Sequence, residues 1–193
     1  IEAGIIERPA DLVTDDYTYE FVGWSSLPTN VHQSYRITPV YKTKYAIKYY
    51  SEDELVYEYR VYQGDAAIDP VLAGLISTPT KQGTDDLRYT FTGWGNLPTN
   101  VQSATNVYAI FANVYPVRYY ATESSTTPHY VQWIKESDDA YDPVITGECS
   151  APVDIITAEE KKLVFSNWNN IPINVTSICQ VYAEYDTYWA ARF

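Results

Sequence analysis

Apolar and polar residues alternate along several stretches of the chain, which is the pattern of β-strands with one buried face. The first such stretch, residues 17–23, places aromatic side chains at every second position and ends at a glycine. Residues 37–50 and 107–119 continue the alternation for longer than an ordinary strand of about 5 or 6 residues. We therefore expect each long run to close one structural unit and to open the next.

Hairpins are predicted where a second strand follows a long run after a polar turn. Residues 55–62 return after an acidic turn, and residues 130–135 return after a longer tip rich in Ser and Thr. Residues 1–16 lack alternation and are expected to form a connection. A helical period is absent apart from a turn or two near 70–76 and 158–162, so the sequence predicts a mainly β fold.

One motif recurs three times, Phe-x-Gly-Trp followed by Leu-Pro-Thr-Asn-Val. It spans residues 21–31, returns almost unchanged at 91–101 and appears in altered form at 165–175, with the tryptophans 70 and then 74 residues apart. Self-similarity at such a period indicates a tandem array of one unit. The candidate structural residues of the motif are Phe21, Gly23, Trp24, Phe91, Gly93, Trp94, Phe165 and Trp168.

The repeat register extends well beyond the motif. A basic residue follows each tryptophan by 24 positions, and an acidic pair precedes each motif; these residues are Lys48, Arg118, Arg192, Asp15-Asp16, Asp85-Asp86 and Glu159-Glu160. The predicted units are a partial repeat at 1–46 that lacks its first hairpin, repeats at 47–116 and 117–190, and the start of a further repeat strand at 191–193. Because both ends cut across units, we expect the chain to be part of a longer protein.

Two segments of the second repeat resemble a known family, Tyr89-Thr90-Phe91-Thr92-Gly93-Trp94 and Val107-Tyr108-Ala109-Ile110-Phe111. With the strand pair and the Pro-containing link before them, they resemble the Listeria-Bacteroides repeat, also called the internalin B-repeat. The resemblance covers essentially the whole chain. It implies small β-grasp-like modules in an elongated tandem array, which serve as spacers, stalks and adhesion elements in bacterial surface proteins and in some phage virion proteins. The family's pattern includes no catalytic residues.

Composition narrows the range of partners. The 193 residues include 13 Lys and Arg against 25 Asp and Glu, a net charge of −12 that repels phosphate backbones, so nucleic acid is not expected as a partner. No apolar run reaches the roughly 18 residues of a spanning helix, so membrane insertion is not expected either. Cys149 and Cys179 are the only cysteines; both a disulfide and free thiols remain open, and a lone pair is not a metal site.

The 20 tyrosines and the motif tryptophans suit thin, partly wet sheets, and an exposed aromatic binding surface is the alternative. We interpret each motif tryptophan as a buried anchor rather than a ligand-stacking platform. Gly23 and Gly93 would then permit a β-bulge or a close backbone approach beside the ring. Asn167 suits the same backbone, because Asn tolerates positive φ better than most residues.

No reactive constellation emerges from the sequence. The acidic pairs are interpreted as solvated turn residues, with a bound Ca²⁺ as the alternative, because a bare Asp-Asp supplies fewer oxygens than Ca²⁺ requires. His32 and His129 occupy non-equivalent positions, and no nucleophile, zinc or phosphate-loop motif is present. We therefore predict no enzyme activity, no cofactor and no catalytic or metal-binding residues.

The sequence thus predicts a non-enzymatic structural or adhesion protein of a bacterial cell surface or a virion surface, acting as a spacer or presenting stalk. Protein partners or neighbouring subunits are expected. One alternative is a module that binds a glycan or a protein receptor through exposed Tyr and Trp. Another is a bacteriophage capsid, tail or fibre component that pairs through an open strand edge.

Overall fold

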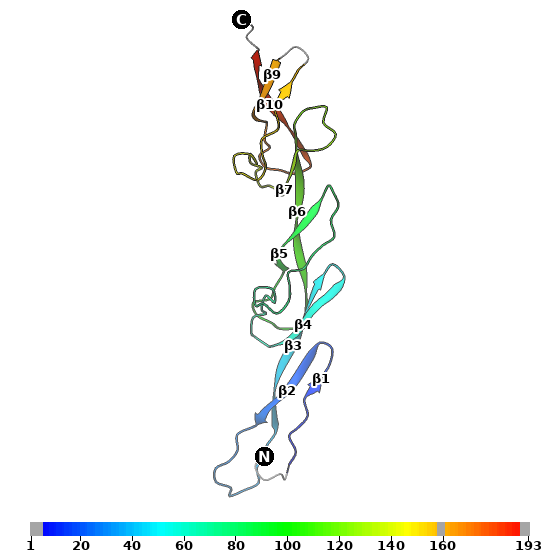
Figure 1. Ribbon diagram of the computed structural model, residues 1–193. Helices are drawn as coiled ribbons and strands as arrows, with labels where there is room; N and C mark the ends of the chain where they lie inside the picture. The colour runs from blue at the N-terminus through cyan, green and yellow to red at the C-terminus, as the bar shows by residue number, and fades with distance from the viewer. Residues whose placement is uncertain (1–5, 158–160, 190–193) are drawn as a thin grey trace. The chain divides into compact units, whose positions relative to one another are not determined.

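The structure, a computed structural model, describes residues 6–157 and 161–189 (Figure 1). These residues form ten strands and no helix, which confirms the mainly β prediction. The strands are β1 (Leu12–Val13), β2 (Tyr17–Trp24), β3 (Pro39–Ser51), β4 (Glu54–Tyr62), β5 (Arg88–Gly95), β6 (Thr105–Tyr120), β7 (Tyr130–Lys135), β8 (Ile155–Ile156), β9 (Lys161–Asn169) and β10 (Cys179–Trp189).

All ten strands belong to one mixed sheet, whose main path runs β1-β2-β3-β6-β10-β9-β8. Off this path, β4 pairs with β3, while β5 and β7 pair with β6. The β3–β6 and β6–β10 pairs are parallel, whereas the hairpins β3–β4 and β6–β7 are antiparallel. Each parallel pair therefore needs a crossover connection, which the irregular segments after β4 and β7 provide.

The two long strands are continuous, as the alternation predicted. β3 has 13 residues; it pairs with β2 through residues 39–45 and with β4 through residues 44–51. β6 has 16 residues and contains the whole predicted run. One strand thus serves two neighbouring hairpins, because its two halves pair with different partners.

The sequence predicts neither of two short strands, and one of them, β1, lies within residues 1–16, where a connection was expected. β1 pairs with β2, and β8 pairs with β9. Each pairing involves two residues, which are too few to show alternation. Residues 70–76 form hydrogen-bonded turns rather than a helix, with the Leu75 N–H donating to the Pro70 carbonyl at 2.9 Å. Of the second predicted helical segment, residues 158–160 lie outside the described residues and Lys161 begins β9.

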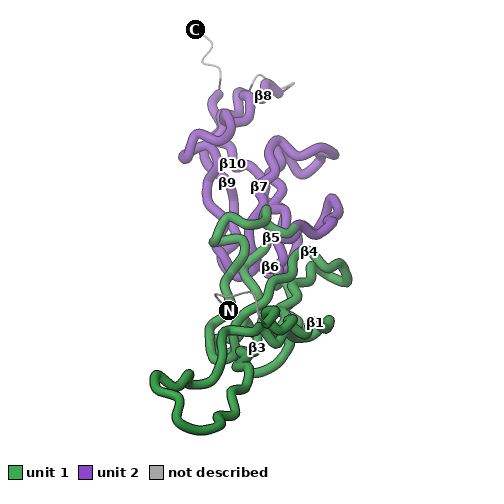
Figure 2. The backbone as a smooth tube through the Cα atoms, turned by 90° about the horizontal axis from the view of Figure 1, so that it is seen from below, with its two compact units in different colours: residues 1–79, 91–110 green, residues 80–90, 111–193 purple. Residues whose placement is uncertain are grey.

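The chain divides into two compact units (Figure 2). Unit 1 comprises residues 1–79 and 91–110, and unit 2 comprises residues 80–90 and 111–193. The predicted repeat boundaries after residues 46 and 116 lie inside β3 and β6. The repeat boundaries remain a prediction, and the two units are described one at a time below.

The core of unit 1 lies between residues 45 and 109. Alternate residues of β3 point to the same face, which brings Ile47 and Tyr49 together under the strands that follow. Each apolar side chain buried in this way contributes about 1.5–3 kcal/mol. The buried members of this core are Ile47, Tyr49, Val61, Trp94, Val101 and Val107.

The core of unit 2 lies between residues 115 and 183 and is built in the same way. Its buried members are Val117, Tyr119, Ile134, Ala140, Trp168, Val175 and Val181. The two cores fall almost entirely within the predicted repeats 47–116 and 117–190, which we call the second and third modules. In the described part of the first copy, residues 6–46, only Thr18 and Ala46 are buried.

Candidate functional site

The Phe and Trp rings of the motif adopt one arrangement three times. In each copy the two rings meet edge to face, with centroids 5.5, 5.3 and 5.2 Å apart in chain order. The rings come from one strand and lie three residues apart, on β2, β5 and β9. The pairs are Phe21 and Trp24, Phe91 and Trp94, and Phe165 and Trp168.

A β-bulge between the two rings explains how residues three apart can meet. In β2 the register shifts between Phe21 and Gly23, and in β9 one residue, Ser166, is likewise left out of the pairing with β10. Gly93 has φ 144°, a value that favours glycine. The alternative of a close backbone approach is wrong, because nothing lies within 4 Å of a Cβ placed at Gly23 or Gly93.

The expected positive φ at Asn167 is also wrong. Positive φ in this stretch falls on Asn170, at 50°, and on Asn174, at 53°. Asn167 instead uses its side chain, whose Nδ2 donates to Glu184 Oε2 on β10 at 2.9 Å. A cross-strand hydrogen bond thus accompanies the bulge where the other two copies have glycine.

The tryptophans of the two complete modules are buried. Trp94 is 9% exposed and Trp168 is 4% exposed, so neither offers a ring face to a ligand. The Trp94 indole N–H donates to Asp69 Oδ1 at 3.2 Å. The same nitrogen of Trp168 is buried and has no hydrogen-bond partner among the described residues. Trp24 of the first copy is only half-buried.

A buried tyrosine ties each hairpin to the connection that follows it. Tyr49 OH donates to the Ile68 carbonyl at 2.6 Å, and Tyr119 OH donates to the Tyr141 carbonyl at 2.9 Å. Burial raises the pKa of both phenols well above the ordinary value. Both groups therefore remain neutral hydrogen-bond donors, which suits a structural tie and not proton transfer.

The acidic pairs meet the basic residues that follow the motif. Lys48 Nζ lies 3.7 Å from Asp16 Oδ1, and Arg118 donates to Asp86 Oδ1 at 2.5 Å. Sequence analysis found both series but did not connect them, because residues 32 positions apart meet only once the strands are paired. Glu159-Glu160 and Arg192, the third such set, lie outside the described residues.

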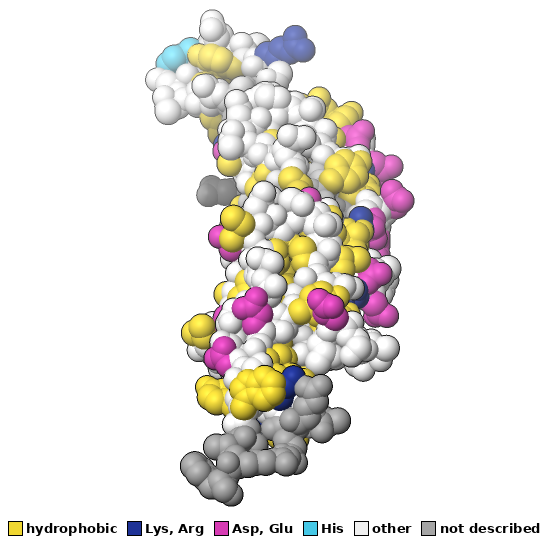
Figure 3. Space-filling model, turned by 90° about the horizontal axis from the view of Figure 1, so that it is seen from above, with side chains coloured by type: hydrophobic (Ala, Val, Ile, Leu, Met, Phe, Trp, Pro, Cys, Tyr) yellow, Lys and Arg dark blue, Asp and Glu magenta, His cyan; other side chains and the backbone are white. Residues whose placement is uncertain are grey.

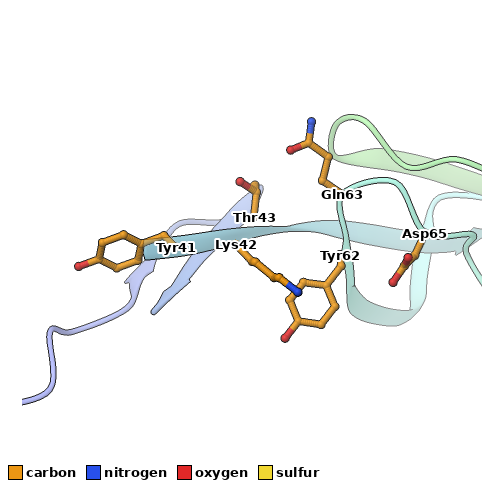
Figure 4. Close-up of a pocket in the computed structure, with 6 residues that line it drawn as sticks. All are labelled: Tyr41, Lys42, Thr43, Tyr62, Gln63 and Asp65. Carbon is orange, nitrogen blue, oxygen red and sulfur yellow. The ribbon is translucent and has the colours of Figure 1, made fainter. Parts of the chain in front are cut away.

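A shallow pocket of about 370 Å³ opens beside β3 in unit 1 (Figure 4). Three consecutive β3 residues line one side, and the end of β4 with the following turn lines the other. The Gln63 N–H donates to the Thr43 carbonyl at 2.9 Å, which fixes the turn against the strand. The lining residues are Tyr41, Lys42, Thr43, Tyr62, Gln63 and Asp65.

Charged side chains contact Tyr62, one of the residues that line this pocket. Tyr62 OH donates to Glu20 Oε2 at 2.5 Å, and Lys44 Nζ lies 2.9 Å from the same oxygen. These two contacts, the Tyr62 hydrogen bond first, lower the pKa of Glu20. The amino groups of Lys44 and Lys42 lie 4.5 and 5.7 Å from the centre of the Tyr62 ring. The pocket can thus offer cationic and hydroxyl groups, and sequence analysis assigned no binding role to any of its residues.

One carboxylate in unit 2 accepts hydrogen bonds from two tyrosine hydroxyls. Tyr130 OH and Tyr141 OH each donate to Glu148 at 2.6 Å. These hydrogen bonds lower the pKa of Glu148, and the bond to Glu148 raises the pKa of Tyr130 to about 12. Cys149, next in sequence, and Cys179 are free thiols, so the structure contains no disulfide between them.

No metal-binding cluster forms in the described part of the chain. No group of three or more His, Cys, Asp or Glu residues there is arranged to hold a metal ion. His32 is exposed, and the ring nitrogen Nε2 of His129 lies 2.8 Å from the Ser150 carbonyl. Residues 6–157 and 161–189 also include no helix long and apolar enough to cross a membrane.

The chain was compared with protein-family models, with curated proteins and with solved structures, and nothing matched in any of the three comparisons. The likeness to the Listeria-Bacteroides repeat therefore rests on the motif residues alone and stays a hypothesis.

Proposed function

We propose that the chain is a non-enzymatic structural or adhesion protein built from tandem β-grasp-like modules, acting as a spacer or presenting stalk on a bacterial cell or a virion. The observation that carries this proposal is the recurrence of one core design in two adjacent stretches of sequence. In each stretch a buried tyrosine and an aspartate bind the connection that follows the hairpin, which suits an element that resists extension.

The recurrence extends to the connections. In the second module Asp69 Oδ1 accepts the backbone N–H groups of Val71 and Leu72, at 2.9 and 3.1 Å. In the third, Asp142 Oδ1 accepts those of the two residues after Pro143, at 2.8 and 3.1 Å. Both turns precede a glycine with positive φ, Gly74 or Gly147. Such agreement in detail supports one module used twice.

The strand order supports a β-grasp-like module. In the second module, β4 pairs with the second half of β3, which lies parallel to the start of β6, and β5 pairs with β6. The third module has the order β7, β6, β10 and β9, again with the central pair parallel. A hairpin, a crossover and a closing strand pair therefore describe both.

A surface location is proposed from the chemistry of the exterior. Acidic side chains are scattered beside hydrophobic ones on the face seen in Figure 3, and the net charge is −12. A strongly charged exterior keeps a protein soluble without a defined binding partner. The free strand edges and the exposed tyrosines offer contacts to protein partners or neighbouring subunits.

Stretching a single molecule tests the spacer proposal. If each complete module is one mechanical element, pulling the chain from its ends should give two separate unfolding events. Each should release about 25 nm of chain, since about 70 residues extend by roughly 3.3–3.6 Å each. One event that releases both lengths together, or gradual extension with no event, would contradict the proposal.

The pocket beside β3 favours glycan binding as a second candidate function. It combines aromatic, amide, hydroxyl and charged groups in an open depression, and Tyr41 is 39% exposed. Binding to an array of bacterial and host glycans should then be lost in Tyr41→Ala. The matched control is Tyr35→Ala, which removes a phenol that is 47% exposed outside the pocket lining. Equal binding by both variants, or no binding by the unaltered chain, rejects this candidate.

A further inference from the structure

The first copy exposes apolar side chains that the complete modules bury. The valine that ends the motif is 1% exposed at Val101 and 1% exposed at Val175, but 68% exposed at Val31. The exposed side chain belongs to the first copy even though its Leu-Pro-Thr-Asn-Val sequence is identical to that of the second. The motif itself therefore does not decide whether this valine is covered.

The closing segment shows the same contrast. Val107 is 0% and Val181 is 1% exposed, whereas Ile37, 13 residues after Trp24 as Val107 is after Trp94, is 38% exposed. Leu27 of the first copy is 65% exposed. We call the surface made by Trp24, Leu27, Val31 and Ile37 the open face.

A hairpin covers the corresponding surface in each complete module. Residues 47–50 of β3 add in parallel to residues 105–108, and residues 117–120 of β6 add in parallel to residues 179–182. The matching residues of the first copy, 35–38, belong to no strand. Their backbone groups therefore lack the parallel partner that the other two copies possess.

The covering hairpin also brings the buried tyrosine. The Tyr49 ring meets Trp94 edge to face with centroids 5.0 Å apart, and the Tyr119 ring meets Trp168 at the same distance. Trp24 contacts Phe21 of its own strand. The open face thus retains one half of an aromatic pair whose other half comes from a hairpin.

We propose that the open face is the docking site of a further β-hairpin with the sequence pattern of β3–β4 and β6–β7. Its first strand pairs in parallel with residues 35–38, and its tyrosine packs on Trp24 as Tyr49 packs on Trp94. Backbone hydrogen bonds to an open edge and a side chain in an apolar pocket are the two components of strand addition. The inference needs the equivalence of the modules but not a surface location for the protein.

A second copy of the chain is a poor occupant of the open face. Both hairpins, β3–β4 and β6–β7, already cover Trp94 and Trp168, each within its own compact unit. A neighbouring copy would have to unfold a module to release one of them. The hairpin that docks is therefore an additional one.

Grafting a hairpin onto the chain tests the proposal. Residues 47–75 are copied ahead of Ile6 in place of residues 1–5, because Ile6 corresponds to Ile76. Mass-spectrometric hydrogen exchange then compares residues 31–38 with residues 101–108. Exchange at 31–38 should slow by about a hundredfold or more, since the amides gain strand hydrogen bonds and burial. A second graft uses residues 117–148, the corresponding part of the third module.

The matched control carries Ile47→Asp and Tyr49→Asp in the grafted hairpin only, and residues 31–38 should then exchange as fast as in the unaltered chain. Rapid exchange at 31–38 in both unmutated grafts would overturn the proposal. Loss of protection at 101–108 in both grafts would overturn it too, since a matching hairpin adds contacts and removes none. Dimerisation of the ungrafted chain that protects 31–38 would assign the face to a second copy instead.

Discussion

Two regions of unit 1 carry nearly the same motif but bury it to different extents. Residues 21–31 and 91–101 share Phe-x-Gly-Trp and Leu-Pro-Thr-Asn-Val, and their Phe and Trp rings meet at almost the same distance. Yet Val101 is buried and Val31 is largely exposed. Local structure therefore follows the motif, whereas burial follows what packs on it.

The third copy supports the same conclusion, because its motif is altered and is nevertheless buried. Its motif is the most altered, with Asn167 for the glycine and Ile171-Pro172-Ile173 for Leu-Pro-Thr, but Trp168 and Val175 are buried. What the two closed copies share is a hairpin with a buried tyrosine, Tyr49 or Tyr119. The hairpin, and not the quality of the motif, determines whether a core forms.

The largest expected effect on stability comes from replacing the motif tryptophan by alanine. The replacement is made once in a complete module and once in the first copy. Trp94→Ala should lower the free energy of unfolding of its module by about 3–5 kcal/mol, because it leaves a cavity in a packed core. Trp24→Ala should cost about 1 kcal/mol or less, as expected for a partly exposed side chain. Urea denaturation followed by circular dichroism measures both. Similar losses for the two variants would mean that the open face is covered in solution.

Removing the tyrosine hydroxyl should have the next largest effect. Tyr49→Phe removes the hydroxyl that donates to the Ile68 carbonyl, and Tyr119→Phe removes the hydroxyl that donates to the Tyr141 carbonyl, which also accepts from Gln132 Nε2 at 3.4 Å. Each change should cost about 1–1.5 kcal/mol while the ring stays in place. Tyr41→Phe is the control, since its hydroxyl makes no hydrogen bond to another described residue. A loss as large in Tyr41→Phe, measured in the same urea series, would show that the ties contribute nothing specific.

The two complete modules differ in the hydrogen bond of the motif tryptophan, and this difference should produce a smaller change in stability. Asp69 accepts the Trp94 indole N–H in addition to two backbone N–H groups, whereas Asp142 Oδ1 accepts only the backbone pair among the described residues. Asp69→Ala should therefore cost about 1 kcal/mol more than Asp142→Ala. Thermal unfolding of both variants measures the difference. Equal losses, or a larger loss in Asp142→Ala, would show that the Trp94 bond to Asp69 adds no stability.

Most strands could be predicted from the sequence because the alternation is long and the repeats confirm one another. The predicted run at 130–135 coincides with β7, and the run at 107–119 lies inside β6. β1 and β8 were missed because two residues carry no period. The φ of Asn167 was mispredicted because a side chain can satisfy a bulge by bonding across it, which the residue type alone does not reveal.

The candidate site was far less predictable. The pocket beside β3 joins residues 41–43 to residues 62–65, and only the β3–β4 pairing brings them together. The same holds for Lys48 with Asp16 and Arg118 with Asp86, whose sequence positions recur but whose contact depends on three-dimensional structure. Repeat register identifies which residues matter together; it does not show which of them touch.

The smallest expected effect is a change at low pH in the first copy that does not occur in the complete modules. The Phe21 N–H donates to Asp11 Oδ1 at 2.8 Å; this bond first, and then Arg8, lowers the pKa of Asp11 below its ordinary 3.8. A carboxylate whose folded pKa is lowered stabilises the fold above the unfolded pKa, and this contribution is lost as pH falls through the folded value. The Phe21 amide signal in NMR should therefore shift with a midpoint below pH 3.8, while the signal of Val101, in an apolar core, stays unchanged. Asp11→Asn should abolish the shift at Phe21. A Phe21 signal that titrates at the ordinary pKa, or persists unchanged in the variant, would show that Asp11 does not hold β2 in the first copy.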